Sequence, residues 1–206
     1  NFNLLQFDDN FEYAGVNPCA EEPLPAGGSC LLGSLNLASF VDEDEWGPKF
    51  AFEDFEDAVE LAVVALNEVL DEGLPLHPLE EQRKSVADWR QIGLGIFGLA
   101  DMLIQLDYKY GSRDAKILCH KIARTMATAA LRSSAKLAAE FGAYPKFNKG
   151  AVMSSEFFNE HFDDETWKLT DAFGLRNSQL LTIAPTGSLS TMLGVSGGIE
   201  PIFDTH

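Results

Sequence analysis

The stretch VNPCAEEPLPAGGSC, residues 16–30, carries the groups from which the fold and chemistry of this chain are inferred. It holds two of the three cysteines, Cys19 and Cys30, and the acidic pair Glu21 and Glu22. Three prolines and a Gly-Gly pair separate these groups and exclude a helix from this part of the chain. The stretch therefore predicts a loop that presents thiols and carboxylates.

Prolines at positions 18 and 23 restrict the residue that precedes each of them. Steric contact with the proline ring moves that residue away from helical angles, so the backbone is expected to be extended over residues 17–22. Side chains two positions apart face the same side of an extended chain. This predicts a short wall on which the Asn17 amide, the Cys19 thiol and the Glu21 carboxylate project together.

The residue types on that wall favour hydrogen-atom transfer over nucleophilic attack. A neighbouring carboxylate disfavours the thiolate form of a cysteine, whereas a nucleophilic cysteine needs a basic partner. None of the four histidines lies near Cys19 in the sequence. A thiol that stays protonated and then loses a hydrogen atom, beside a carboxylate that accepts a proton from substrate, fits these residues better.

Non-catalytic interpretations of the same residues remain open. Glu21 and Glu22 can form a solvated acidic pair, which is the ordinary state of adjacent glutamates. Cys19 and Cys30 can serve as zinc ligands, although neither a Cys-x-x-Cys spacing nor a nearby histidine supports this. The third cysteine, Cys119, lies within a helical pattern and is typical of a buried structural thiol.

The segments NPCAEEPL and GGSCLLGSLNL resemble the active-site segment of the large, catalytic subunit of ribonucleotide reductases, which remove the 2′-hydroxyl of ribonucleotides. The resemblance implies that Cys19 becomes a thiyl radical that abstracts the substrate 3′-hydrogen. It also implies that Glu21 is the general base on the 3′-hydroxyl and that Asn17 hydrogen-bonds the ribose hydroxyls. Cys30 is implied to be one of two cysteines that reduce the radical intermediate and end as a disulfide. Glu22 is expected to be structural or exposed.

The stretch APTGSLSTMLGVSGGIEP, residues 184–201, provides a second resemblance to the same family. Its first glycine permits a tight turn in which successive N–H groups form an anion nest, and the hydroxyls of Thr186, Ser188 and Ser190 add donors. No lysine or arginine lies within seven residues of Gly187, so N–H groups and hydroxyls are the expected phosphate ligands. The implied substrate-binding residues are Asn17, Glu21, Pro185, Thr186, Gly187, Ser188 and Leu189.

The stretch RQIGLGIFGLADML, residues 90–103, contains a literal G-x-G-x-x-G pattern. A dinucleotide site requires an apolar strand before the first glycine, but the preceding KSVADWRQ is polar and charged. The glycines are interpreted instead as allowing a helix to pack closely against a barrel. The segment also resembles the Arg-x-Ile-Gly-x-Gly segment of ribonucleotide reductases, which gives three family-like segments in family order.

Local patterns predict the secondary structure between these segments. Hydrophobic periodicity predicts an amphipathic helix over 52–70 and a longer helix over 114–141, with Ser112 as N-cap and Gly142 after its end. Two short helices with Ser and Asp caps are expected within 154–174, and a short buried strand over 179–184. The acidic runs DEDE and HFDDE are expected to be solvated caps and loops.

Together these features predict an α/β fold, as a helix-rich partial segment of the ten-stranded α/β barrel of ribonucleotide reductases. Residues 1–206 are expected to form one partial catalytic-barrel domain: an active-site finger-loop segment over 1–41, a mainly helical part over 52–175, and a strand plus phosphate-binding loop over 179–206. The chain begins without Met and stops in mid-motif, so it is expected to be a piece of a longer polypeptide. The implied redox partner of Cys30 then lies upstream, outside this chain, and the isolated piece is expected to be inactive.

The net charge of −17 argues against nucleic acid and anionic membranes as partners. No apolar leader or span is recognised, so a cytoplasmic location is expected.

The resemblance implies a ribonucleoside diphosphate or triphosphate substrate, a thioredoxin-type reductant, and a homodimer of the complete protein. The motif sequences resemble those of the adenosylcobalamin-dependent members most. A separate metal-radical small subunit is the alternative radical source, and no metal site is expected in this chain. The competing hypothesis is a non-catalytic nucleotide-binding or assembly module that retains the fold.

Overall fold

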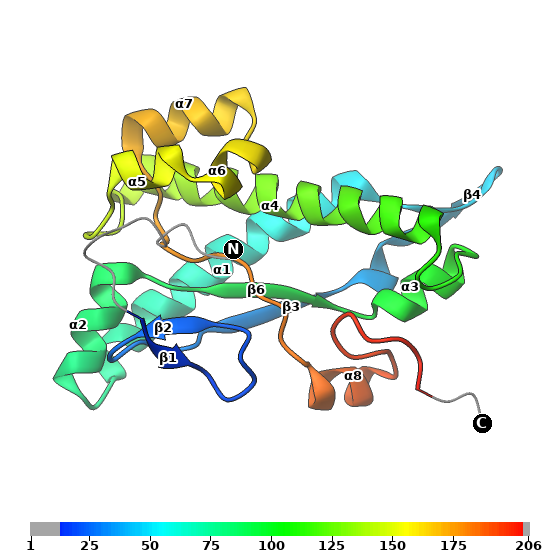
Figure 1. Ribbon diagram of the computed structural model, residues 1–206, viewed down its shortest axis with the longest axis horizontal. Coiled ribbons are helices and arrows are strands. Elements are labelled where there is room, and N and C mark those ends of the chain that lie inside the picture. Colours follow the sequence, from blue (N-terminus) through cyan, green and yellow to red (C-terminus); the bar gives the residue numbers. More distant parts are fainter. Residues whose placement is uncertain (1–12, 204–206) are drawn as a thin grey trace.

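The computed structural model of the protein describes residues 13–203, and a short parallel sheet runs through its middle (Figure 1). Strand β3 (Leu32–Asn36) pairs in parallel with β6 (Gly93–Phe97). All five residues of β6 are buried, because helices and the chain near the C-terminus cover the strand. The parallel pair confirms an α/β arrangement, in which the connection from β3 to β6 passes through helices.

Residues 179–184 lie along the other edge of β6. The Leu94 N–H donates to Leu180 O (2.8 Å), and the Thr182 N–H donates to Leu94 O (3.0 Å). Leu94 and Leu181 form a single parallel bridge. The short buried strand predicted for this segment is confirmed only in part, because its pairing is limited to that bridge and Ile183 is exposed.

Two long helices pack together over the sheet (Figure 1). Helix α1 spans Phe52–Gly73 and α4 spans Arg113–Phe141, as the hydrophobic periodicity predicts. The Ser112 hydroxyl caps α4 by accepting from the Ala115 N–H (3.2 Å), and Gly142 ends it at a φ of +86°. A left-handed φ of this kind suits glycine because glycine has no Cβ.

Shorter elements complete the described chain. The strands are β1 (Tyr13–Val16), β2 (Pro23–Pro25), β4 (Val41–Asp44) and β5 (Gly47–Phe50). The helices are α2 (Glu80–Trp89), α3 (Leu99–Gln105), α5 (Lys149–Ser154), α6 (Glu156–His161), α7 (Asp164–Phe173) and α8 (Gly187–Leu193), with 3-10 turns η2 (Leu37–Phe40) and η3 (Leu74–Leu76). The predicted Ser and Asp caps are confirmed, because Ser155 caps α6 and Asp163 caps α7.

An ion-pair cluster fastens α1, α4 and α7 to one another. The Arg132 guanidinium lies in α4 and pairs with Glu56 and Glu60 of α1, the second at 2.7 Å. It also pairs with Asp163 at the start of α7 (3.0 Å). One guanidinium with several donors can hold three carboxylates, so this cluster fixes the helical layer over the sheet.

A buried polar network fixes the chain just before residues 179–184. Asn177 is fully buried, and its amide exchanges hydrogen bonds with the Asn67 amide of α1 (3.0 and 2.9 Å). Its Nδ2 also donates to Arg90 O (2.9 Å), while its N–H donates to the Ser134 hydroxyl (3.1 Å). Buried polar groups that are fully satisfied specify one arrangement, so this network sets where the following extended segment begins.

Two sequence interpretations of local structure are wrong. The glycines of G-x-G-x-x-G lie in and directly after strand β6, and do not belong to a helix packed on a barrel. The run DEDE was expected in a solvated cap or loop. Most of it lies in β4, where it is exposed as expected but pairs with β5 in an antiparallel hairpin. Residues 45 and 46 form the turn, and Gly47 follows it at a φ of +108°.

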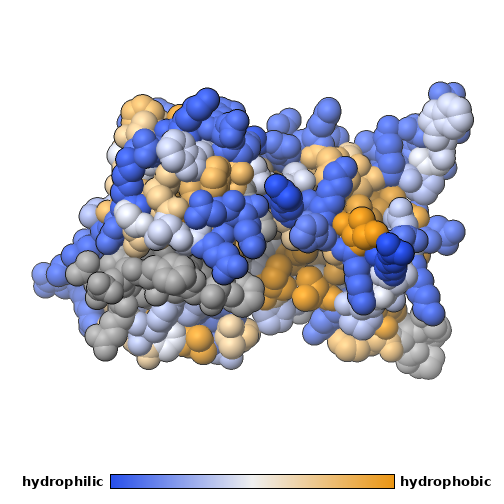
Figure 2. Space-filling view, turned by 45° about the horizontal axis from the view of Figure 1, so that its top comes forward, coloured by the Kyte–Doolittle hydropathy of each residue, from blue (hydrophilic) through white to orange (hydrophobic). Residues whose placement is uncertain are grey.

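The strands that the structure describes do not close a barrel, since they form three separate two-stranded sheets apart from the bridge to Leu181. Hydrophilic residues cover much of the face shown in Figure 2, with smaller apolar areas between them. Among residues 13–203, no helix has both the length and the apolar character needed to cross a bilayer.

Candidate active site

The cysteine-bearing loop connects β1 and β2, which pair antiparallel with Val16 opposite Pro23. Within the loop, the Ala20 N–H donates to Asn17 O (2.9 Å), which closes a tight turn. The Asn17 side-chain Oδ1 accepts from the Glu22 N–H (2.9 Å). We call residues 17–22 the thiol loop, because Cys19 lies at its exposed end.

The extended backbone predicted for the thiol loop is wrong. Residues 17–20 form a turn with Pro18 in its second position, where the fixed φ of proline is favourable. Ala20 takes a φ of +62°, and the pairing of β1 with β2 holds both ends together. Strand alternation therefore does not place Asn17, Cys19 and Glu21 on one wall; they share a six-residue loop instead.

Two side chains from residues 179–184, the extended segment beside β6, hold the thiol loop against the rest of the fold. The Thr182 hydroxyl donates to Glu21 O (2.8 Å), and the Gln179 amide donates to Pro23 O (2.9 Å). Gln179 is itself held by the Gln91 amide at the start of β6 (2.5 Å). The loop is thus positioned by residues that lie far from it in the sequence.

Two glycines of β6 allow this attachment. A Cβ on Gly95 would lie 2.7 Å from Thr182 O, and one on Gly93 would lie 2.7 Å from Thr182 Cγ2 and from Leu32 Cδ2. Such distances are shorter than real Cβ contacts, so any larger residue would push Thr182 away. The G-x-G pattern therefore serves the close approach of the segment that holds Glu21.

Two carboxylates, Glu21 and Glu22, lie at the end of the thiol loop. Glu22 is only 3% exposed, so of the two expectations for it, structural or exposed, the second is excluded. Neither of its oxygens, nor Oε2 of Glu21, makes a well-formed hydrogen bond within residues 13–203. Burial raises the pKa of Glu22 to about 7; the Cys30 thiol nearby lowers it and the Glu21 charge raises it.

Glu22 is the residue at this site that sequence reasoning missed. A carboxylate between Glu21 and a proline carries no local signal of burial. Its burial belongs to the fold around the loop, in which Glu22 comes directly before Pro23, the partner of Val16.

All three cysteines are free. Cys19 and Cys30 are exposed, and they lie near enough for an ionised Cys19 to raise the pKa of Cys30. Burial on one side and the Glu22 and Glu21 charges also act on Cys30 and bring its pKa to about 12, although the residue as a whole is exposed. Cys119 is half-buried in α4 and packs against the core, where burial raises its pKa, in line with a structural thiol.

The predicted phosphate loop follows the extended segment directly. Thr186 takes a φ of +51° and starts helix α8, whose first N–H groups have no partner within a helix. Gly187, Ser188 and Leu189 are exposed on this turn. The Thr186 hydroxyl accepts from the Gly198 N–H (2.9 Å), so the chain after α8 folds back on the loop.

One predicted hydroxyl donor of this loop is wrong. Ser190 is buried, and its hydroxyl donates to Gly187 O (3.1 Å). It therefore braces the turn of the loop and is not directed at a ligand.

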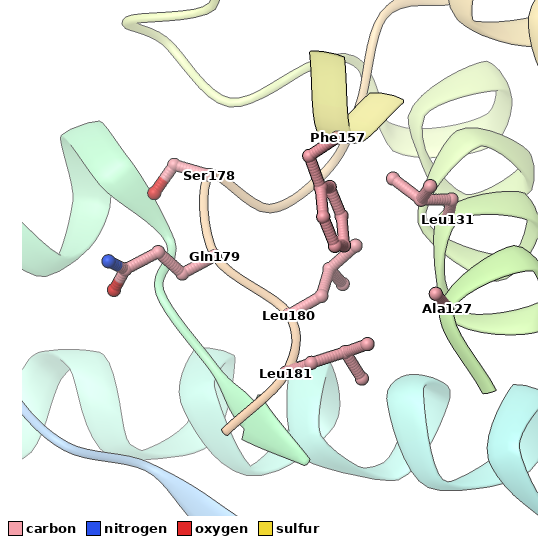
Figure 3. Close-up of a pocket in the computed structure, with 7 residues that line it drawn as sticks. All are labelled: Ala127, Leu131, Phe157, Ser178, Gln179, Leu180 and Leu181. Atoms are coloured by element: carbon pink, nitrogen blue, oxygen red, sulfur yellow. The ribbon is translucent and has the colours of Figure 1, made fainter. Parts of the chain in front are cut away.

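A small cavity lies on the opposite side of the extended segment (Figure 3). Leu180 and Leu181 face Phe157, Leu131 and Ala127 across it, whereas Ser178 and Gln179 point away. Five of its seven lining residues are apolar, which does not suit a phosphorylated ligand. Within residues 13–203, no group of three or more His, Cys, Asp or Glu side chains is arranged to hold a metal ion.

Comparison with known proteins agrees with the motifs. The profile described as "Ribonucleotide reductase, barrel domain" matches residues 11–206. The chain belongs to the ribonucleotide reductase family. This confirms the family inferred from the three motif segments, and it identifies the described fold as a partial segment of the ribonucleotide reductase barrel domain.

Named relatives of this reductase segment come from distant organisms. It is 36% identical over 188 residues to a vitamin B12-dependent ribonucleoside-diphosphate reductase of Thermoplasma acidophilum, covering 91% of the chain and 22% of the relative. A protein of the same name from Mycobacterium tuberculosis is 33% identical, with 91% of the chain and 24% of the relative covered. The ribonucleoside-diphosphate reductase large subunit of Danio rerio is 32% identical over 84% of the chain and 22% of the relative. The chain thus spans less than a quarter of the length of these relatives.

Proposed function

We propose that this chain is the thiol-loop and phosphate-loop segment of an enzyme that reduces ribonucleotides to 2′-deoxyribonucleotides by a thiyl-radical mechanism. The observation that carries the proposal is the attachment of the loop bearing Cys19 to the segment that leads into residues 185–189. Thr182 and Gln179 make that attachment. One polypeptide segment can thereby hold the ribose end and the phosphate end of one nucleotide.

Cys19 and Glu21 carry the first step. The Cys19 thiol is exposed at the end of the loop, so both a radical source and a substrate can reach its sulfur. As a thiyl radical, Cys19 takes the hydrogen atom from C3′ and becomes a thiol again. The Glu21 carboxylate accepts the proton of the 3′-hydroxyl, and its buried Oε2, which no described residue satisfies, is suited to that hydroxyl.

Asn17 orients the ribose. Its Oδ1 is occupied by the Glu22 N–H (2.9 Å), which fixes the amide so that Nδ2 is the group offered to a ribose hydroxyl. Cys30 supplies one of two thiols that reduce the substrate radical and become a disulfide. Its partner belongs to the part of the polypeptide upstream of this chain.

The phosphate end is assigned to Pro185, Thr186, Gly187, Ser188 and Leu189. Backbone N–H groups at the start of a helix bind phosphate without a lysine or arginine, which suits a chain of net charge −17. The relatives are named ribonucleoside-diphosphate reductases, which supports a diphosphate substrate.

Adenosylcobalamin is the proposed radical source, because two of the relatives are named vitamin B12-dependent. When bound, it supplies the radical that oxidises the Cys19 thiol. The exposed position of Cys19 fits such a source, and it equally fits a metal-radical small subunit as the alternative. Residues that hold the cofactor are assigned to the remainder of the polypeptide.

A thioredoxin-type dithiol is the proposed reductant, because the disulfide left by each turnover must be reduced. The complete protein is proposed to form a homodimer and to work in the cytoplasm. Free cysteines suit a reducing compartment of that kind.

The test compares Cys19→Ser with Cys30→Ser in the complete polypeptide. Cys19→Ser is expected to abolish exchange of the substrate 3′-hydrogen and formation of deoxyribonucleotide. Cys30→Ser is expected to retain the 3′ chemistry while blocking turnover with a thioredoxin-type reductant. Deoxyribonucleotide formation by Cys19→Ser, or wild-type turnover by Cys30→Ser, contradicts the assigned roles. The competing hypothesis, a non-catalytic nucleotide-binding module, requires nucleotide binding by calorimetry without 3′-hydrogen exchange in the wild type.

A further inference from the structure

The chain after helix α8 returns to the start of helix α3, and Ser196 is the residue held there (Figure 1). The Gly98 N–H donates to Ser196 O (2.8 Å), and the Ala100 N–H donates to the Ser196 hydroxyl (3.2 Å). The Ser196 N–H donates to the Asp101 carboxylate (2.7 Å). Asp101 lies in the first turn of α3, so the start of this helix fixes the returning chain through its backbone and through one carboxylate.

Directly after Ser196, the same chain meets the proposed phosphate loop, residues 185–189. The Gly198 N–H donates to the Thr186 hydroxyl (2.9 Å). Apart from bonds inside α8, this is the hydrogen bond that joins the loop to the rest of the described residues, 13–203. The loop therefore depends on the returning chain for its position.

Close contacts leave the returning chain little freedom beside the loop. A Cβ on Gly197 would lie 2.9 Å from Pro185 O, and one on Gly198 would lie 3.1 Å from Ala184 O. Gly198 also takes a φ of +47°, which suits glycine. Segments packed this closely transmit a displacement from one to the other, so a shift of Ser196 reaches the phosphate loop.

We propose that Asp101 is a positioning residue for the phosphate end of the substrate. Its carboxylate holds Ser196, and the chain from Ser196 to Gly198 holds the turn whose N–H groups are assigned to phosphate. A hydrogen bond to a carboxylate is shorter and stronger than one between neutral groups, and the distance of 2.7 Å between Ser196 N and Asp101 Oδ2 lies in that range. The proposal rests on the proposed function, because it takes residues 185–189 as the phosphate site.

Different attachments hold the two ends of the proposed nucleotide site. Thr182 and Gln179 hold the thiol loop from the segment before α8, whereas Asp101 acts on the phosphate loop through the chain after α8. A functional site needs such supporting residues to keep its binding groups in place. Loss of Asp101 is therefore expected to weaken the grip on the phosphates and to leave the 3′ chemistry of the bound substrate intact.

The test measures KM and kcat for cytidine diphosphate in the complete polypeptide, together with inhibition by inorganic pyrophosphate. Asp101→Ala leaves the Ser196 N–H without its charged acceptor and is expected to raise KM and the pyrophosphate inhibition constant by about fivefold to thirtyfold. The value of kcat is expected to stay within about twofold of the wild type. Hydrogen exchange of the Gly198 amide is expected to be faster by about the same fivefold to thirtyfold, with the Thr182 amide unchanged.

Two variants separate the Asp101 contact from a general effect of charge. Asp114→Ala removes a carboxylate from the first turn of α4 and is expected to leave KM unchanged. Asp101→Asn keeps an oxygen that can accept from the Ser196 N–H, so its KM is expected to lie between those of the wild type and Asp101→Ala. Circular dichroism reports folding. If Asp101→Ala unfolds the protein, Ser196→Ala replaces it; this variant loses only the hydroxyl that accepts from the Ala100 N–H, and a smaller rise in KM is expected.

An unchanged KM in the folded variant overturns the proposal, as does a fall in kcat without a change in KM. Equal acceleration of the Gly198 and Thr182 amides also overturns it, because a general loss of stability then accounts for the effect. The exchange of the Gly198 amide is measured without substrate or turnover. Failure of the proposed function, shown by deoxyribonucleotide formation in Cys19→Ser, is therefore distinguishable from failure of the Asp101 contact.

Discussion

Replacing Gly95 by alanine tests how the site is assembled. The added Cβ would lie 2.7 Å from Thr182 O, which is a backbone atom and has no rotamer with which to move aside. The extended segment must shift, and two hydrogen bonds to β6 are then strained: Thr182 N–H to Leu94 O (3.0 Å) and Leu94 N–H to Leu180 O (2.8 Å). Overpacking costs about 1–3 kcal/mol and the two weakened hydrogen bonds together about 1 kcal/mol, so we expect a local loss of about 2–4 kcal/mol.

Hydrogen exchange of the complete polypeptide measures this loss where it occurs. Since about 1.4 kcal/mol corresponds to a factor of ten, the amides of Leu94 and Thr182 are expected to exchange roughly 30-fold to several-hundred-fold faster. The same displacement moves the hydroxyl that holds Glu21 O, so deoxyribonucleotide formation is expected to fall as well.

Gly73→Ala is the matched control for Gly95→Ala. Nothing lies within 4 Å of a Cβ built on Gly73, and its φ of −74° is helical. Alanine there is expected to be neutral or to stabilise by up to about 1 kcal/mol. If the Thr182 amide is equally protected from exchange in Gly95→Ala and Gly73→Ala, the close approach of Thr182 to Gly95 does not position the thiol loop, and the reasoning is refuted.

Two further predictions concern the loop and the helical layer. Asn17→Ala removes the acceptor of the Glu22 N–H and should lower the stability of the loop by about 1 kcal/mol. Limited proteolysis within the thiol loop should then be faster. Equal cleavage rates in the variant and the wild type would argue against that hydrogen bond. Arg132→Met should lower the urea midpoint at neutral pH by an amount equivalent to about 1–3 kcal/mol, because its carboxylate partners are partly screened by water. Burial raises the pKa of Glu60, but hydrogen bonds from Arg132 and Lys136 outweigh it and lower the pKa overall. A carboxyl group whose pKa is lower in the folded protein stabilises the fold above its unfolded pKa of about 4, and this stability is lost as the pH falls through the folded pKa. Acid sensitivity in that range should therefore be smaller in Arg132→Met. An unchanged pH dependence would contradict the cluster.

Local sequence patterns were sufficient to predict the helices, but they did not predict the shape of the thiol loop. The helices α1 and α4 repeat their apolar residues every three to four positions, and this signal is complete within each segment. The thiol loop takes its shape from the pairing of β1 with β2 and from Thr182, which is not a local signal. Proline restricted single residues correctly, but the angles of neighbouring residues followed the strand pairing.

The sequence spacing drew attention to one thiol of the site and said nothing about the surroundings of the other. Spacing along an extended chain suggested that a carboxylate acts on Cys19 through Glu21. In the folded chain, burial and then the charges of Glu22 and Glu21 raise the pKa of Cys30, although both carboxylates lie eight or nine residues away in the sequence. The glycines of β6 were misinterpreted for a related reason, because their neighbour Thr182 comes almost ninety residues later.

The hydrogen bond from Thr182 to Glu21 O joins residues 161 positions apart, and this separation orders events during synthesis. Contacts between distant residues form late, because closing a long stretch of chain costs entropy before the contact can repay it. On the ribosome, both cysteines of the site leave the exit tunnel long before the segment that fixes them. The nascent chain therefore carries two unplaced thiols while the residues between Glu21 and Thr182 are made, which makes this interval the one in which a wrong disulfide can form.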